Sequence, residues 1–228
     1  MTGIFRTDLL LPVPIRRAWL AFTAPEYLAT WLAPVRECDI RPGGRITFDL
    51  PGASGITWTV EAVEAPARLV WIEPPGSVPS ERRTTVTLEP AGPDVTSVAI
   101  EEAGFGAGPV WQGHLDGTRL GWAQSLAGLQ LYLRTGVTYD RMNTFRGAVG
   151  AHLSDGPAGP EVVEVAAGSY AEAAGLRPGD IILRLGAAPV FGLSDVWLFC
   201  REHAPGEHVE VVFARDGSVR SSAGPLGN

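Results

Sequence analysis

The chain of 228 residues contains no lysine, so all 18 of its basic residues are arginine. Acidic residues number 25, which gives a formal net charge of -7. Basic residues form no run longer than the pairs Arg16-Arg17 and Arg82-Arg83. Proteins that bind a phosphate backbone need a concentrated basic surface. The sequence therefore argues against nucleic acid as a partner.

Long apolar runs are also missing. No stretch reaches the roughly 18 apolar residues that a membrane-spanning helix needs. The first residues lack the basic segment, apolar run and cleavage site of a signal peptide. We therefore expect a cytoplasmic protein with no membrane span.

Cysteine and histidine are too scarce and too scattered to indicate a metal centre. Cys38 and Cys200 fall in different halves of the chain, which is typical of small buried side chains. The histidines show no metal-binding spacing; they are residues 114, 152, 203 and 208. We expect no metal and no cofactor.

The first half of the sequence changes its apolar period twice. In "PIRRAWLAFTAPEYLATWLAP" (14–34), helical spacing predicts two short helices, and Thr23 with Glu26 predicts a capping box for the second. Residues 45–102 then alternate apolar and polar between Gly- and Pro-rich turns, which predicts an antiparallel meander. From Pro109 an apolar stripe of helical period runs to Gly136, which predicts one long helix.

This order of elements resembles the helix-grip fold of the START-like (SRPBCC) superfamily. The blocks "PGGRITFDL", "VEAPARLVWIEP" and "GWAQSLAGLQLYLRTG" resemble the family named after the activator of heat shock protein 90 ATPase. The resemblance implies an α+β domain over residues 1–136, with an antiparallel sheet around a long C-terminal helix. It also implies a cavity for an apolar small molecule, which we expect to be lined by Phe48, Trp58, Trp71, Leu88, Trp122 and Leu126.

Two alternatives remain open for this domain. The same aromatic residues could simply fill a core, because Trp and Phe at strand spacing are first of all packing residues. A catalytic role would need an acid or base, and His114, near Glu101 and Glu102, is a weak candidate. A solvated histidine at a helix start explains the same residues. The chaperone connection is weak, because the eukaryotic activator's separate ATPase-stimulating domain has no counterpart here.

The second half contains a compact series of turn signals in "GSYAEAAGLRPGDIIL" (168–183). Ser169 and Glu172 predict the start of a helical turn, and Gly175 predicts its left-handed end. Pro178-Gly179 suits a type II turn, after which an aliphatic strand follows. The block resembles bacterial PDZ domains, which implies a small β-barrel or sandwich over residues 145–228, joined to the first domain by a linker, residues 137–144.

A PDZ resemblance implies a site that captures a protein C-terminus or an extended peptide. The loop amides would hold the terminal carboxylate, and the exposed edge of the following strand would accept the peptide as an added strand. The residues that this assignment selects are Gly147, Ala148, Val149, Gly150, Ala151, Leu153, Val196 and Cys200. Val196 and Phe199 could instead belong to the core, and the groove could be closed by the chain itself.

The sequence thus favours a non-enzymatic binding or adaptor protein that is co-chaperone-like at most by resemblance. One domain would hold an apolar small molecule and the other a peptide. The alternative is a cyclase- or hydrolase-like enzyme that uses the first cavity and docks through its PDZ domain.

Overall fold

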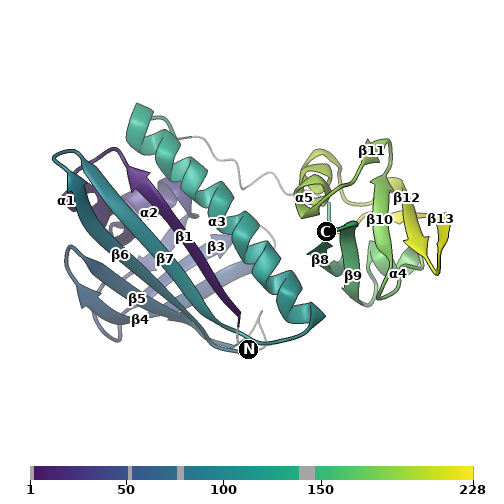
Figure 1. The fold of residues 1–228 in the computed structure, drawn as a ribbon, viewed down its shortest axis with the longest axis horizontal. Helices are drawn as coiled ribbons and strands as arrows, with labels where there is room; N and C mark the ends of the chain where they lie inside the picture. The colour runs from purple at the N-terminus through teal and green to yellow at the C-terminus, as the bar shows by residue number, and fades with distance from the viewer. Residues whose placement is uncertain (1–2, 51–52, 76–79, 139–146, 228) are drawn as a thin grey trace. The chain divides into compact units, whose positions relative to one another are not determined.

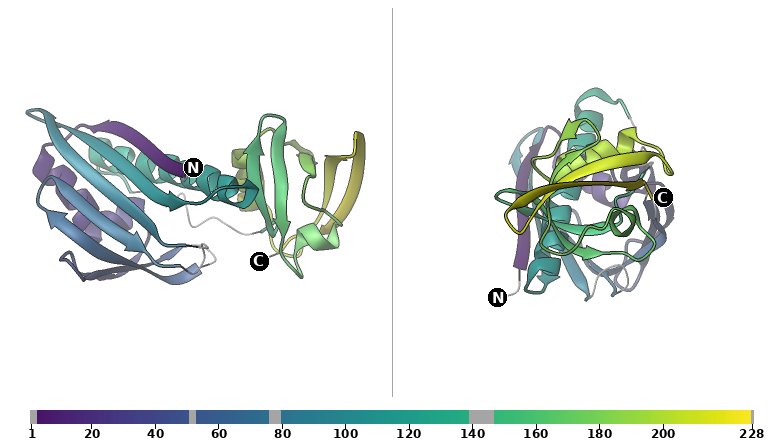
Figure 2. Two further views of the ribbon diagram at one scale, coloured as in Figure 1. Left: turned by 60° about the horizontal axis from the view of Figure 1, so that its bottom comes forward. Right: turned by 90° about the vertical axis from the view of Figure 1, so that its right-hand side faces the viewer.

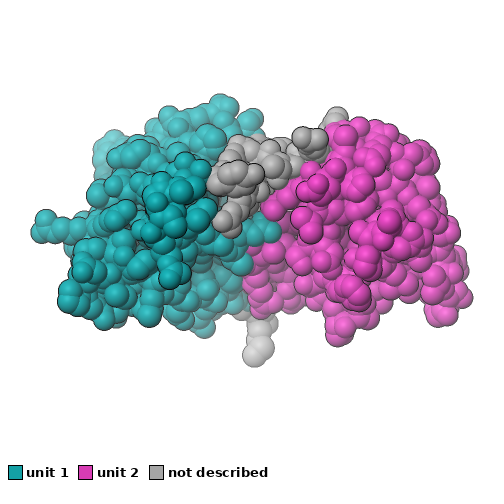
Figure 3. All heavy atoms as spheres, turned by 90° about the horizontal axis from the view of Figure 1, so that it is seen from above, with its two compact units in different colours: residues 1–106, 121–143 teal, residues 107–120, 144–228 magenta. Residues whose placement is uncertain are grey.

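The computed structural model describes residues 3–50, 53–75, 80–138 and 147–227. The chain divides into two compact units, coloured separately in Figure 3. Unit 1 holds residues 1–106 and 121–143, and unit 2 holds residues 107–120 and 144–228. Most of the predicted linker, residues 139–144, lies outside the described residues. The predicted domain boundaries stay a prediction.

Unit 1 is built on one antiparallel sheet of seven strands, with the order β1-β7-β6-β5-β4-β3-β2 (Figure 1). The first strand of the chain therefore pairs with the last strand of the meander. Every other pair in this sheet joins two strands that are consecutive in the sequence. The strands are β1 (Gly3–Leu11), β2 (Val35–Cys38), β3 (Arg45–Leu50), β4 (Ala53–Glu64), β5 (Arg68–Glu73), β6 (Arg82–Gly92) and β7 (Val95–Phe105).

The period-two pattern explains which face of this sheet is buried. In β6, Thr84, Val86 and Leu88 are buried while the residues between them are more exposed. In β7, Val98 and Ile100 are buried in the same alternating way. Successive side chains of a strand point to opposite faces, so an alternating sequence leaves one apolar face to cover. The fold is α+β, as the sequence predicts.

Three helices accompany the sheet: α1 (Ile15–Thr23), α2 (Pro25–Trp31) and the long α3 (Pro109–Thr135). The predicted Thr23–Glu26 capping box is wrong. Thr23 is the last residue of α1, and its hydroxyl donates to the carbonyl of Trp19 at 2.8 Å. Helix α2 begins with Pro25, whose fixed φ suits a first helical position and whose missing N–H costs nothing there.

Residues 121–135 of α3 pack on α2 and β1 in unit 1. Gly128 lies against Trp31, because a Cβ added at Gly128 would be 3.7 Å from the Trp31 Cα. The Gln130 side chain donates to the Leu10 carbonyl of β1 at 2.7 Å. Gly136, at φ +72°, follows the helix, as the predicted C-terminal stop requires.

Unit 2 contains a second antiparallel sheet with the order β13-β12-β10-β9-β8, and β11 pairs with β10. Figure 2 shows the β8–β9 hairpin in green and the β12–β13 hairpin in yellow. The short helix α4 lies beside β13, and the longer α5 lies beside β8. The elements are β8 (Ala151–Gly156), β9 (Gly159–Val165), α4 (Tyr170–Ala173), β10 (Ile181–Leu185), β11 (Ala188–Pro189), α5 (Leu193–Glu202), β12 (His208–Arg215) and β13 (Ser218–Pro225).

The turn signals of this unit form as predicted. The Ser169 hydroxyl accepts the Glu172 N–H at the start of α4, and Gly175 has φ +68° just beyond its end. The β12–β13 hairpin turns at Asp216 and Gly217, both with positive φ, which suits the right-handed twist of the strands. Among all described residues, the helices are either too short or too polar to cross a bilayer.

Candidate functional site

The loop that precedes β8 is fixed at both ends by backbone hydrogen bonds. The Gly147 N–H donates to the Cys200 carbonyl of α5 at 2.9 Å. Ala148 exchanges two hydrogen bonds with Gly227, each 2.9 Å long. The Val149 carbonyl accepts the Ala171 N–H of α4 at 2.9 Å. The loop therefore starts β8 from a rigid frame.

Gly150 is the position in this loop where no other residue fits. Its φ is +65°, a left-handed conformation that L side chains rarely adopt. A Cβ at this position would lie 2.3 Å from the Ser169 Cβ. The Gly150 carbonyl accepts the Ala166 N–H at 3.0 Å, which holds this turn in place.

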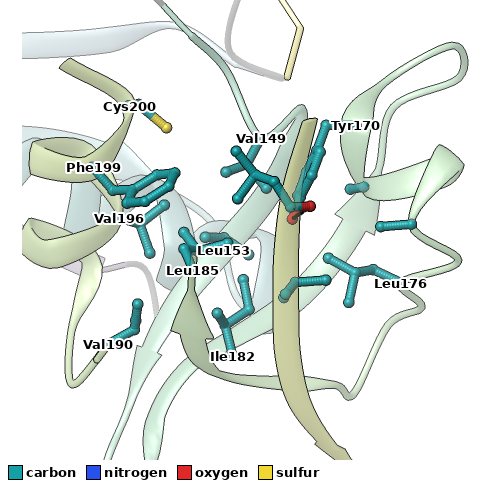
Figure 4. Packing of buried hydrophobic residues seen from close by; sticks show 14 of the residues in the cluster. Val149, Leu153, Tyr170, Leu176, Ile182, Leu185, Val190, Val196, Phe199 and Cys200 are labelled. Carbon is teal, nitrogen blue, oxygen red and sulfur yellow. Dashed lines mark hydrogen bonds between the residues drawn. The ribbon is translucent and has the colours of Figure 1, made fainter. Parts of the chain in front are cut away.

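The predicted pocket side chains meet in one apolar cluster (Figure 4). Val149 and Leu153 come from the loop and β8, and Val196 and Cys200 come from α5. All four are buried, and Phe199 of α5 is buried with them. Burial raises the pKa of the Cys200 thiol to about 11, although the Val149 N–H donates to it. The thiol is therefore protonated at neutral pH and packs as an uncharged side chain in this cluster.

Strand β8 lies at the end of its sheet and pairs with β9 on one side. Leu153 stands opposite Val162, whose N–H and C=O bond to Asp180 and Gly179 on the far side of β9, so the backbone groups of Leu153 and, two residues later, Asp155 point away from β9. The Asp155 carboxylate accepts the Leu193 N–H at 3.1 Å and so ties β8 to the start of α5.

In unit 1 the structure brings three of the predicted cavity residues into contact. Trp58 stacks on Trp71 with ring centroids 4.9 Å apart and planes 6° apart, and Phe48 meets Trp58 edge-on at 4.5 Å. Phe48 and Trp71 are buried, whereas Trp58 is half-buried. Leu88 and Leu126 are also buried in this unit. A cavity lined by these residues remains a prediction.

A buried acidic residue lies beside the sixth predicted cavity residue, Trp122. The Trp122 Nε1–H donates to Glu102 at 2.9 Å, and Arg82 forms an ion pair with the other Glu102 oxygen at 3.0 Å. Arg82 also pairs with Glu73 at 2.5 Å. Burial raises the pKa of Glu102, while the charge of Arg82 and the Trp122 hydrogen bond act in the opposite direction.

His114 lies in the segment of α3 that belongs to unit 2, whereas Glu101 and Glu102 belong to unit 1. The His114 ring is 4.3 Å from the His152 ring of β8. Glu101 forms an exposed ion pair with Arg6. No trio of His, Cys, Asp or Glu side chains in the described ranges is placed to hold a metal ion.

Two known protein families match this chain, one in each half of the sequence. Residues 12–134 match the model of the family described as activator of Hsp90 ATPase homolog 1-like protein. The chain belongs to this family. Residues 147–223 match the PDZ domain model, so a PDZ domain follows the family's own domain. A search of curated proteins found no match.

Solved structures agree on the fold of the first domain. A crystal structure of a Mesorhizobium loti protein is 24% identical, with a TM-score of 0.52, and covers 59% of this chain and 100% of its own. The solution structure of the Aha1 dimer from Colwellia psychrerythraea is 17% identical, with a TM-score of 0.51, covering 59% and 98%. DynU16, from the dynemicin biosynthetic locus, is 16% identical, with a TM-score of 0.52, covering 96% and 79%.

Sequence reasoning missed three groups around these sites. It did not find Asp116, whose carboxylate reaches β8, or the pairing of Arg82 with Glu102. It also missed Arg215, which holds the carboxylate of Asp180 behind the Pro178-Gly179 turn. Each involves partners at least 20 residues apart, so no local spacing could have indicated it.

Proposed function

We propose that the protein is a non-enzymatic adaptor whose PDZ domain takes a protein C-terminus or an extended peptide along β8. An activator-type domain followed by a PDZ domain fits a binding role. The observation that carries the proposal is the geometry of β8, whose outward N–H and C=O groups begin directly after a rigid loop that contains Gly150. Strand addition uses such an edge, and side-chain pockets give the selectivity.

The pocket chemistry favours a small or medium apolar residue at the peptide end. Val149, Leu153 and Val196 supply branched aliphatic walls, and Cys200 adds a neutral thiol. None of these side chains carries charge, so a charged terminal residue would lose its hydration without gaining a partner. The Gly147 and Ala148 N–H groups already donate to backbone carbonyls, and the Val149 N–H donates to Cys200. The terminal carboxylate would therefore be held by the amides nearest β8, at Gly150 and Ala151, which carry partial positive charge.

In the first domain, we propose that an apolar small molecule binds near the Phe48, Trp58 and Trp71 rings. The support is the half-buried Trp58, which stacks on a buried ring and leaves part of its own surface exposed. The enzyme alternative has no comparable support. Its candidate base, His114, packs against His152 in unit 2.

The peptide proposal is tested by NMR titration of the full chain with a synthetic decapeptide that ends in valine, and with the same peptide amidated at its C-terminus. We expect amide shifts in residues 149–153 with the free carboxylate only. Shifts that are identical for both peptides would show that the loop does not recognise a C-terminus. Native mass spectrometry after incubation with a fatty acid tests the first-domain proposal, with Trp58→Ala expected to weaken the complex.

A further inference from the structure

The edge of β8 that a peptide would need is already in contact with another part of the chain. The first turns of α3, residues 109–120, belong to unit 2 and lie along this edge. At Gly113 the approach is so close that a Cβ would be 2.5 Å from the Leu153 carbonyl oxygen. The absence of a side chain is therefore what allows the helix to reach the strand.

A buried carboxylate fixes the helix at the next outward-facing position of the strand. Asp116 is 7% exposed, and its Oδ2 accepts the Asp155 N–H at 3.0 Å. Its Oδ1 accepts from Gln112 at 2.9 Å and from Arg119 at 3.0 Å. A buried charge is stable only when it is paired and hydrogen-bonded. The Asp155 N–H therefore has a charged acceptor in the position that a peptide carbonyl would take.

Two further contacts extend the same helix face. Leu120 packs against the apolar cluster that contains the pocket side chains. The His152 Nε2–H donates to the Val110 carbonyl at 2.9 Å. Gly113, Asp116 and Leu120 are spaced at i, i+3 and i+7, which places them on one side of a helix. We call these three residues the docking face of α3.

We infer that the docking face of α3 is a built-in competitor for the peptide, so that the PDZ groove opens only when this part of the helix leaves β8. The inference rests on the proposed peptide site, because it concerns the regulation of that site. It requires only that helix and peptide use the same groups, Leu153 C=O and Asp155 N–H. When a ligand binds only one of two states, its apparent affinity falls in proportion to the fraction of molecules in that state.

The glycines of α3 supply a matched pair of variants. Gly113→Ala adds a methyl group that collides with β8, whereas Gly117→Ala, one turn later, adds a methyl group with nothing within 4 Å. Both changes favour the helix to a similar extent, because alanine is the better helix former. Any difference between them therefore reports contact with β8 and not the stability of the helix. Asp116→Ala removes the acceptor of the Asp155 N–H without adding volume, and so weakens the contact between α3 and β8 in a second, independent way.

The first measurement needs no peptide. Hydrogen exchange of the Asp155 amide, followed by NMR, should be about tenfold faster in Gly113→Ala and in Asp116→Ala than in wild type, as expected for loss of a charge-assisted hydrogen bond. Gly117→Ala should exchange at the wild-type rate. Wild-type exchange in both Gly113→Ala and Asp116→Ala would overturn the inference.

The second measurement is fluorescence anisotropy with a fluorescein-labelled decapeptide that ends in valine. Gly113→Ala should bind it about tenfold more tightly than wild type and Gly117→Ala do, in line with the exchange result. Equal binding by all variants would overturn the competition and leave the peptide site itself standing. Faster exchange without any preference for the free carboxylate over the amidated peptide, in every variant, would instead overturn the proposed function, and the competition with it.

Discussion

Arg215 holds the buried carboxylate of Asp180 with two nitrogens, each 2.6 Å from a carboxylate oxygen. Asp180 is 1% exposed, and its Oδ2 also accepts the Arg177 N–H at 2.7 Å. The Arg215 guanidinium reaches the Gly175 carbonyl as well, at 2.8 Å. One side chain of β12 thus joins both ends of the segment between α4 and β10.

Arg215→Met should destabilise unit 2 by about 3 kcal/mol, because it leaves a buried carboxylate without its charged partner. Arg220→Met is the control, because the ion pair of Arg220 with Asp216 is exposed and 4.0 Å long, and such pairs contribute little to stability. Urea unfolding of both variants, followed by circular dichroism, measures the difference. Equal stabilities would mean that the ion pair does not hold the turn.

The same pair predicts how unit 2 responds to acid. Burial alone would raise the pKa of Asp180, but the hydrogen bonds and charges of Arg215 and Arg177 outweigh it and lower the pKa below 3.8. A carboxyl whose pKa is lower in the folded state stabilises the fold above its unfolded value. This contribution should be lost as the pH falls below about 4. Urea unfolding at stepwise lower pH should show a steeper loss in wild type than in Asp180→Asn.

Local signals in the sequence were sufficient for most of the architecture. The change from helical to period-two spacing marks the sheet of unit 1, and Ser169 and Gly175 mark turns that form as expected. These signals depend on residues within four positions of one another, where backbone preferences dominate. Thr23 failed as a cap because Pro25 opens α2 directly, and two helix signals competed for the same short segment.

The contact between α3 and β8 could not be predicted, because it joins residues about 40 positions apart. A glycine inside a helix costs about 1 kcal/mol relative to alanine, so Gly113 does carry a signal of close approach. The sequence contains equivalent glycines at 117 and 121, and neither has an atom within 4 Å of an added Cβ. The pattern therefore indicates that some close contact exists without selecting the position.

Gly150→Ala should destabilise unit 2 by about 3 kcal/mol, because it adds a collision with Ser169 to the strain of positive φ. Gly168→Ala separates the two effects. Gly168 has a similar φ of +72°, but a Cβ there meets nothing within 4 Å, so about 1 kcal/mol is expected. Thermal unfolding compares the two variants, and equal losses would argue against tight packing of the loop on α4.

The two cysteines should differ in reactivity. Burial raises the pKa of both thiols, but Cys200 is 4% exposed and reaches about 11, whereas Cys38 is half-buried. The thiolate is the reactive form, so iodoacetamide at mildly alkaline pH should modify Cys38 first. Mass spectrometry of tryptic peptides follows both sites, and denaturant should abolish the difference. Rapid modification of Cys200 in the native protein would show that the α5 side of the groove is open.

Glu102 should give unit 1 a pH dependence of the opposite sign to that of Asp180. Burial raises the pKa of Glu102 above 4.5, so the folded state holds the proton more tightly than the unfolded state does. The stability from this group is then fully present below the unfolded value and is lost as the pH rises through the folded value. Glu102→Gln should remove this loss, whereas Glu101→Gln, at an exposed ion pair with Arg6, should keep it.

Five of the seven tryptophans, among them Trp58, Trp71 and Trp122, lie in unit 1, whereas Trp111 and Trp197 belong to unit 2. Tryptophan fluorescence during urea unfolding therefore follows unit 1 when every variant also carries Trp111→Phe and Trp197→Phe. Stability should be compared at a series of pH values upward from about 4.5, the ordinary Glu range. A slope that is unchanged in Glu102→Gln would mean that Arg82 neutralises the carboxylate fully. In that case the Arg82–Glu102–Trp122 cluster would be a closed ion pair and not a group able to take up a proton.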